Sequence, residues 1–334
     1  MTRQILLAVA LLAALWLLWR LADVLLLVMA AVIVAVVIRS LSDPLVRHLR
    51  LAPKAALSII MVFLIASLAG GTFFFGARIA GELVELAENV PVLINQLGER
   101  FGISDAGQRL SAWAAQFVDG GLFLDVAGYT ISLAGVATAG LVVFFGGIFL
   151  AFGTETYIGG VLLLVPERQR PRFRQVFEEV GRSLRLWLLG QLSAMVLVGL
   201  ASFVGLVLLG VPSALALGIL AGLLEFVPFV GALVAFAVAF LVALGHDPWL
   251  ALWVTLLYVA IQQVESNLLV PLIQQHTVSL PPALGLFSII AVGTLFGPLG
   301  ILLAVPLTIV VLVAVRRFYV EGLLGKPMRP LSED

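Results

Sequence analysis

The stretch QQVESNLLVPLIQQH, residues 262–276, places polar side chains between two long apolar runs of the sequence. The second run is interrupted by glycine and proline between residues 293 and 300, and again at Pro306. At bilayer depth, polar side chains and helix breakers are costly unless they face protein or a water-filled cavity. We therefore expect the stretch from Gln262 to Pro306 to contribute the functional site of a membrane protein.

The composition excludes a water-soluble protein. Hydrophobic residues make up 62% and charged residues 11% of the 334 residues, and the mean hydropathy is +1.17. No water-soluble surface could accommodate this composition. We predict an all-α polytopic integral membrane protein with about eight hydrophobic helical segments.

The sequence also limits the chemistry that the protein can perform. It has no cysteine and only three scattered histidines, so we expect no disulfide framework, no metal centre and no cofactor. It contains no nucleophile–base pattern and no glycine-rich loop with a phosphate-binding lysine. We therefore predict that the protein is not an enzyme, and that it is not an ATP-driven pump unless a separate subunit supplies the ATPase.

Hydropathy and charge divide the chain into successive regions. These are three N-terminal spans (1–77), an amphipathic helical excursion outside the cytoplasm (78–135), a fourth span (136–165), a cytoplasmic amphipathic helix (166–185), a transport core (186–320) and a cytoplasmic tail (321–334). Arg20 and Asp23 interrupt the first apolar run, which we interpret as two short helices, with one long helix as the alternative. Asp43 and Pro44 predict a turn and a helix start.

The distribution of charge predicts the orientation in the membrane. Residues 39–54 and 166–185 are rich in arginine and lysine, and Arg316 and Arg317 follow the last apolar run. Residues 78–135 instead carry three arginines against seven acidic residues. By the positive-inside rule we expect both termini to lie in the cytoplasm. The predicted location is a bacterial cytoplasmic (inner) membrane.

Two C-terminal segments, 212–245 and 281–315, share a layout in which proline and glycine break a long apolar run near its centre. Paired interrupted helices are the best sequence indication of a transporter site. Two topologies fit: kinked helices that each cross once, or re-entrant hairpins with tips near residues 228–231 and 297–300. The length of the segments favours hairpins or strongly broken helices, because about 20 residues suffice to cross a bilayer.

Two carboxylates stand out in this core. Glu225 lies three residues before Pro228, and a charge at the bilayer centre costs at least ~2.5 to 3.5 kcal/mol, so the carboxylate should be paired, protonated or solvated. An interfacial position, with no functional role, is the alternative. Glu265 shares a helical face with Gln262, which indicates a site; the alternative is a helix end capped by Asn267.

Smaller residues complete the expected pathway. Thr294 could offer its hydroxyl to a ligand or bond back to its own helix, and the glycines could equally serve close helix packing. The candidate pathway residues are Glu225, Pro228, Gly231, Gln262, Glu265, Asn267, Pro271, Thr294, Gly297 and Gly300.

Two motifs resemble the C-terminal signature of the autoinducer-2 exporter family of membrane transporters (AI-2E, PerM-like). They are VESNLLVP at 264–271 and LFGPLGILLAVP at 295–306. Upstream, EFVPFVG at 225–231 and Gly190-Gln191-Leu192 are similar to the preceding blocks of that family. The sequence departs from the family pattern at Pro281, where a histidine often precedes a proline, and at Gln274-Gln275, which replaces a glycine. The resemblance implies homo-oligomers, with pentamers as the expected assembly.

Three functions follow as hypotheses. The first is a secondary transporter or exporter of small polar solutes, with an autoinducer-2-like signalling molecule as the cargo that the resemblance suggests. The second is a Na+(Li+)/H+ antiporter that uses Glu225 and Glu265 as alternately protonated ligands. The third is a membrane scaffold that transports nothing and tolerates replacement of both carboxylates. The expected partners are therefore a small polar solute or a monovalent cation or proton, the lipid bilayer and further copies of the chain; no nucleic acid is expected.

Overall fold

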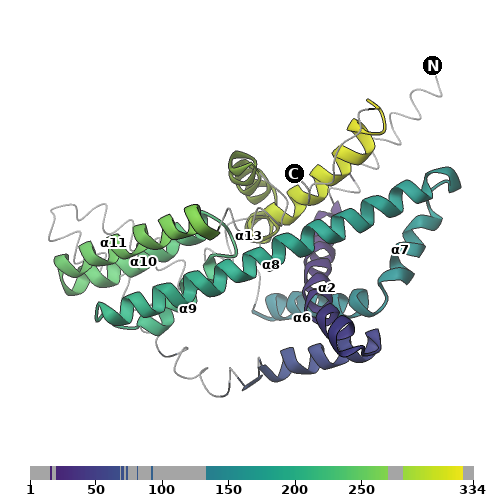
Figure 1. The fold of residues 1–334 in the computed structure, drawn as a ribbon. Helices are drawn as coiled ribbons and strands as arrows, with labels where there is room; N and C mark the ends of the chain where they lie inside the picture. Colours follow the sequence, from purple (N-terminus) through teal and green to yellow (C-terminus); the bar gives the residue numbers. More distant parts are fainter. Residues whose placement is uncertain are drawn as a thin grey trace.

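A computed structural model describes residues 20–67, 133–269 and 281–325, together with isolated positions at 16, 69, 70, 73, 81 and 92. Every regular element among these residues is a helix, which confirms the predicted all-α class (Figure 1). By length and composition, three of the described helices could cross a bilayer alone, one of which, Ala283–Glu321, is broken at Gly297. One bent pair makes a fourth if it is counted as a single span.

The first described helix, α2, runs from Ala22 to Leu49 and so begins where we expected the first apolar run to be interrupted. Residues 1–15 and 17–19 lie outside the described residues, so the choice between two helices and one stays a prediction. The expected turn at Asp43 and Pro44 is wrong, because α2 continues through Pro44. Pro44 removes one backbone hydrogen bond from the helix, and the packing of α2 against α6, α8 and α13 compensates for this loss.

A second helix, Pro53–Ser67, matches the start of the expected third span. The rest of that span and nearly all of the amphipathic excursion lie outside the described residues. Helix α6, Leu133–Phe152, covers the first part of the region 136–165, which we predicted to hold the fourth span. At Gly153 the chain bends by 86° into α7, Thr154–Leu163.

Helix α8, Arg170–Leu208, follows the short 3-10 helix η1, Glu167–Gln169. The amphipathic helix that we expected at 166–185 and the span that we expected after it are continuous in this helix. No proline and no glycine pair interrupts the sequence after Pro171, so the polar part simply extends the apolar part as one helix. Figure 1 shows α8 running along the described fold, where it contacts α2, α9, α11 and α13.

The first of the two broken segments folds back on itself. Its helices are α9, Ala214–Leu224, and α10, Val230–His246, joined by a turn at residues 225–229. Phe229 has a φ of 66°, and a Cβ added to Gly231 would lie 1.8 Å from the carbonyl oxygen of Leu224. Pro228 cannot continue the hydrogen-bonded ladder of α9, and only glycine permits this close approach after the turn. The segment is therefore a helical hairpin.

The second broken segment is α13, Pro282–Ala314, in which Gly297 has the non-helical angles φ 65° and ψ −149°. A Cβ added to Gly293 would lie 2.7 Å from Cγ1 of Ile301. A straight helix would separate residues eight apart by about 12 Å. The chain thus doubles back at Gly297, and both C-terminal segments favour the hairpin alternative over a single kinked span.

The remaining elements of the C-terminal half connect these hairpins. They are α11, Pro248–Val264, the π-helix η2, Glu265–Leu269, and a second π-helix, η3, Val315–Val320. One hydrophobic core joins α2, α8 and α13, and a second joins α8, α9, α10 and α11. Within the second core α9 packs closely on α8, because Gly199 faces Gly218 and Gly222 with no side chain between the backbones.

Candidate functional site

Glu225 ends α9 at the tip of the first hairpin, and only 1% of its surface is exposed. The turn that follows is anchored to α8, because the ring of Phe226 meets the ring of Trp187 edge-on at 5.9 Å between centroids. Among the described residues no donor reaches Oε2 of Glu225. The fold therefore places a carboxyl group in a buried position at the hairpin tip, where one of its oxygens can still accept a hydrogen bond.

Glu265 stands at the start of η2, directly after α11, and its carboxyl group lies within hydrogen-bonding distance of that of Glu225. Gln262 donates its Nε2 hydrogen to Oε2 of Glu265 at 3.2 Å, as the shared helical face predicted. From α8, Gln191 donates its Nε2 hydrogen to the backbone carbonyl of Glu225. We call Glu225, Glu265, Gln262 and Gln191 the carboxyl cluster.

The chemistry of the carboxyl cluster follows from its charges. Two ionised carboxylates in contact repel each other, and a single proton or a monovalent cation between them removes that repulsion. The turn at residues 225–229 and the π-helix η2 interrupt regular helix on both sides of the pair. Interrupted helices supply backbone carbonyl groups that can coordinate a cation or a polar solute. The arrangement can therefore bind and release a small cation or a proton.

Residues from the tips of both hairpins belong to one hydrophobic core. Phe226 and Val227 from the first tip belong to the same core as Phe296, which directly precedes Gly297 at the second tip. The structure thus brings the two predicted broken segments together. Gly231 and Gly297 allow the backbone to turn at the tips, and Gly300 packs so closely that an added Cβ would lie 2.3 Å from the carbonyl oxygen of Val292.

Two other predicted residues do not join the carboxyl cluster. The Nδ2 group of Asn267 donates to the backbone carbonyl of Gln263 at 2.9 Å and to its side chain at 2.8 Å, which matches the helix-end alternative. Thr294 donates its hydroxyl hydrogen to the carbonyl of Ala291 at 3.0 Å, so it bonds back to its own helix. Pro271 lies outside the described residues. No group of three or more His, Asp or Glu that could hold a metal ion occurs in the described part of the chain.

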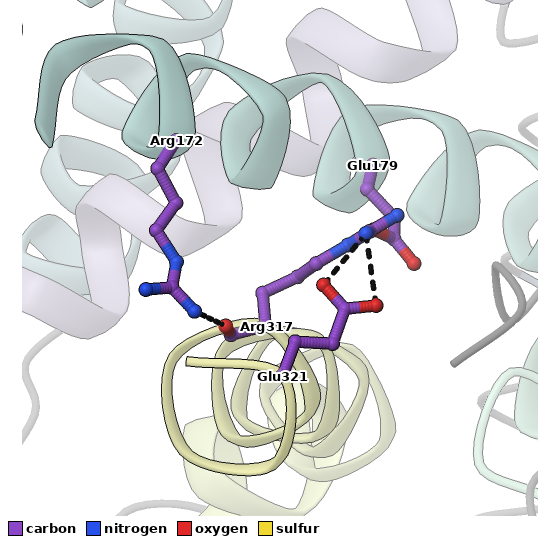
Figure 2. Close-up of polar contacts among 4 residues, drawn as sticks. All are labelled: Arg172, Glu179, Arg317 and Glu321. Carbon is purple, nitrogen blue, oxygen red and sulfur yellow. Dashed lines mark hydrogen bonds and ion pairs between the residues drawn. The ribbon is translucent and has the colours of Figure 1, made fainter. Parts of the chain in front are cut away.

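Sequence reasoning missed a cluster that ties η3 to α8 (Figure 2). The Nη1 group of Arg317 bonds both carboxylate oxygens of Glu321, at 3.0 and 2.8 Å, and its Nε pairs with Glu179. Arg172 donates to the backbone carbonyl of Arg317 and lies over the ring of Phe318. The spacing of Arg317 and Glu321 along one helix was the available signal, whereas the pairing with Glu179 depends on how the helices pack.

The sequence profile of a family described as "AI-2E family transporter" matches residues 5–319. Among curated proteins, the chain is 32% identical over 148 residues to "Putative transport protein YueF" of Bacillus subtilis, covering 44% of this chain and 40% of that protein. It is 29% identical over 164 residues to "Putative permease PerM" of Escherichia coli, covering 48% of this chain and 45% of that protein. The chain thus spans less than half the length of these relatives.

Proposed function

We propose, from the premise that this chain belongs to the AI-2E family of membrane transporters, that it is a secondary transporter of small polar solutes with the Glu225–Glu265 pair as its ion-binding group. One observation carries the proposal. Two carboxyl groups from separate elements, the end of α9 and the start of η2, lie within hydrogen-bonding distance of each other, and Glu225 is buried. Such a pair is costly for the fold unless it serves an ion or a proton.

The hairpin tips supply the moving parts of this transporter. Both tips turn at residues with backbone angles that few side chains allow, and they share one hydrophobic core. Binding of a cation or proton between the carboxyl groups would remove their repulsion and draw α9 and η2 together. A change of that kind at a tip can pass to the second hairpin through the shared hydrophobic core, and so open one side of the route while closing the other.

The cargo is proposed from the family alone. Its name points to the export of an autoinducer-2-like signalling molecule, a small polar solute, and the names of the two relatives describe a transport protein and a permease. The amide and carboxyl groups of the carboxyl cluster together donate and accept hydrogen bonds, which suits a polar cargo.

A second candidate function is Na+(Li+)/H+ antiport. The direct contact of Glu225 with Glu265 favours it, because one pair of carboxyl groups can hold either a proton or a monovalent cation, but not both at once. Alternate occupation of such a pair is sufficient for exchange, without an organic cargo.

We further propose how the protein lies in the membrane. Basic residues at the start of α8 and at Arg316 and Arg317 support cytoplasmic termini in a bacterial inner membrane. Many large apolar side chains on α6, α8 and α11 are exposed, among them Phe149, Leu208 and Trp253. They would face lipid or neighbouring copies in a homo-oligomer, with the pentamer that the resemblance implies as the expected assembly.

The test is flux into proteoliposomes that contain the purified protein and an internal pH-sensitive dye. Sodium and lithium gradients are applied to the wild type and to Glu225→Gln, Glu265→Gln and the control Glu167→Gln, whose side chain is 88% exposed. Cation-driven proton movement that either cluster variant abolishes would establish antiport. Without such movement, efflux of a radiolabelled polar solute is measured in the same variants. Flux that both cluster variants leave unchanged would refute the site, and a wild type that moves neither ions nor solutes would support the scaffold hypothesis.

A further inference from the structure

Ser202 on α8 and Tyr258 on α11 form a second polar site inside the transport core. Ser202 is completely buried and Tyr258 is 8% exposed. Their hydroxyl groups lie near each other, although neither oxygen meets the full geometry of a hydrogen bond within the described residues. We call these two residues the hydroxyl pair.

A helical hydroxyl group ordinarily satisfies itself on its own helix, and the same two helices show this. Ser193 on α8 donates to the carbonyl of Leu189 at 2.8 Å, and Thr255 on α11 donates to that of Ala251 at 2.8 Å. Ser202 does not bond back in this way. A buried polar group with unused hydrogen-bonding capacity destabilises a fold, so a further hydrogen-bonding group beside Ser202 and Tyr258 would stabilise both.

The hydroxyl pair is aligned with the carboxyl cluster on both helices. On α11, Tyr258, Gln262 and Glu265 recur at the spacing of one helical face, which places Tyr258 roughly 10 Å along the axis from Glu265. On α8, Ser202 follows Gln191 by about three turns and so shares its face. Gly205 packs against Leu257 one turn further on, which fixes the two helices against each other at this level.

We propose that the hydroxyl pair is a second station of the transport pathway, about 10 Å from the carboxyl cluster, that holds uncharged hydrogen-bonding groups. This inference rests on the proposed function and extends it. Two neutral hydroxyls suit the hydroxyl groups of a solute or the water that hydrates it, rather than a bare ion. The rings of Phe236 and Tyr258, 5.8 Å apart, give the station an aromatic wall.

Accessibility to water tests the station, and the absence of natural cysteine makes the test direct. Ser202→Cys, which preserves size, is compared in proteoliposomes with Ala239→Cys, a position equally buried in the same core. The probe is a small, charged, water-soluble methanethiosulfonate, whose sulfur forms a mixed disulfide with an accessible thiol and releases a sulfinate. We expect modification of Ser202→Cys at least tenfold faster than of Ala239→Cys. Equal, slow modification of both variants, with intact elution in detergent, would overturn the proposal.

Two further arms identify what occupies the station. Ribose, an uncharged polyol, is added during labelling: slower modification assigns the station to solute hydroxyl groups, and an unchanged rate assigns it to pathway water. Tyr258→Phe then separates transport from a structural role. We expect ribose efflux, or the cation-driven proton flux, to need a roughly three- to tenfold higher concentration for half-saturation, at an unchanged melting temperature. A lower melting temperature with normal flux would mean that the hydroxyl is merely structural.

These outcomes remain distinct from those of the carboxyl cluster. Labelling of Ser202→Cys does not require transport, so it can succeed even where Glu225→Gln and Glu265→Gln leave flux unchanged. Conversely, flux that depends on both carboxylates, together with an unreactive Ser202→Cys, would refute the station alone.

Discussion

The side chain of Gln191 on α8 donates a hydrogen bond to the backbone carbonyl of Glu225, the residue that ends α9. This bond fixes the tip of the first hairpin to α8, the longest of the described helices. It also satisfies a carbonyl that the end of α9 would otherwise leave unpaired, and it sets where the Glu225 carboxyl group points relative to Glu265.

Replacement of Gln191 by leucine should therefore affect both stability and transport. The change keeps the approximate volume but removes the donor, which leaves a partly buried carbonyl unsatisfied at a cost of about 1 to 3 kcal/mol. We expect a lower melting temperature in detergent and at least a several-fold loss of the flux described above. Ser193→Ala on the same helix is the control, because Ser193 is exposed and bonds only its own helix. Equal melting temperatures and fluxes in the two variants would contradict this role of Gln191.

Because the first broken segment folds back on itself, adding a single methyl group at Gly231 should strongly reduce the stability of the protein. In Gly231→Ala the new Cβ would meet the carbonyl oxygen of Leu224, which is backbone and cannot move aside without opening the turn. We expect a loss of about 2 to 4 kcal/mol in the free energy of unfolding, as for other overpacked positions. The measurement is thermal or denaturant unfolding in detergent.

Gly285→Ala is the matched control for this prediction. Nothing lies within 4 Å of its added Cβ, and Gly285 lies within α13. Alanine favours a helix over glycine by up to about 1 kcal/mol, so this variant should be as stable as the wild type or more so. A Gly231→Ala protein that behaves like Gly285→Ala would mean that the first segment is not a closed hairpin.

The sequence indicated a break in each of these segments, and favoured hairpins or strongly broken helices, for a physical reason. Pro228 and Gly297 are incompatible with a continuous straight helix, and each segment is longer than one crossing needs. The contact between Glu225 and Glu265 was not predictable in the same way, although both residues were singled out. It depends on where α9 folds back and how α11 packs beside it, and neither follows from local spacing.

The differences from prediction have a common cause. Pro44 and the change from polar to apolar sequence near residue 185 both look like helix boundaries, yet α2 and α8 continue through them. Tertiary packing of a long helix outweighs one lost hydrogen bond or a change of side-chain polarity. The hydroxyl pair could not be recognised from the sequence, because a serine and a tyrosine in apolar helices form no motif. Their significance depends on the hydrogen bonds that their hydroxyl groups lack in the structure.

The backbone of Gly297 leads to a prediction about the second hairpin. Its angles, φ 65° and ψ −149°, lie in a region that only glycine occupies readily, so Gly297→Ala should cost about 1 to 3 kcal/mol of stability. Because the two tips share a core, the strain should also reduce transport. We expect a lower melting temperature and reduced flux in proteoliposomes, with Gly285→Ala again as control. Full stability of Gly297→Ala would show that the tip adopts a different backbone.

The ion pairs of Arg317 predict a measurable coupling between η3 and α8. The side chains of Arg317, Glu179 and Glu321 are only 23%, 10% and 22% exposed, so removal of Arg317 leaves two carboxylates together and poorly hydrated. A double-mutant cycle with Arg317→Ala and Glu179→Ala should give a coupling of about 1 to 3 kcal/mol in the free energy of unfolding. The same cycle on Arg170 and Glu167, 3.6 Å apart and more exposed, should give at most about 0.5 kcal/mol.

High salt should weaken the coupling of Arg170 with Glu167 more than that of Arg317 with Glu179, because partly buried charges are less screened. Equal couplings in the two cycles would show that the contact in Figure 2 does not hold η3 to α8.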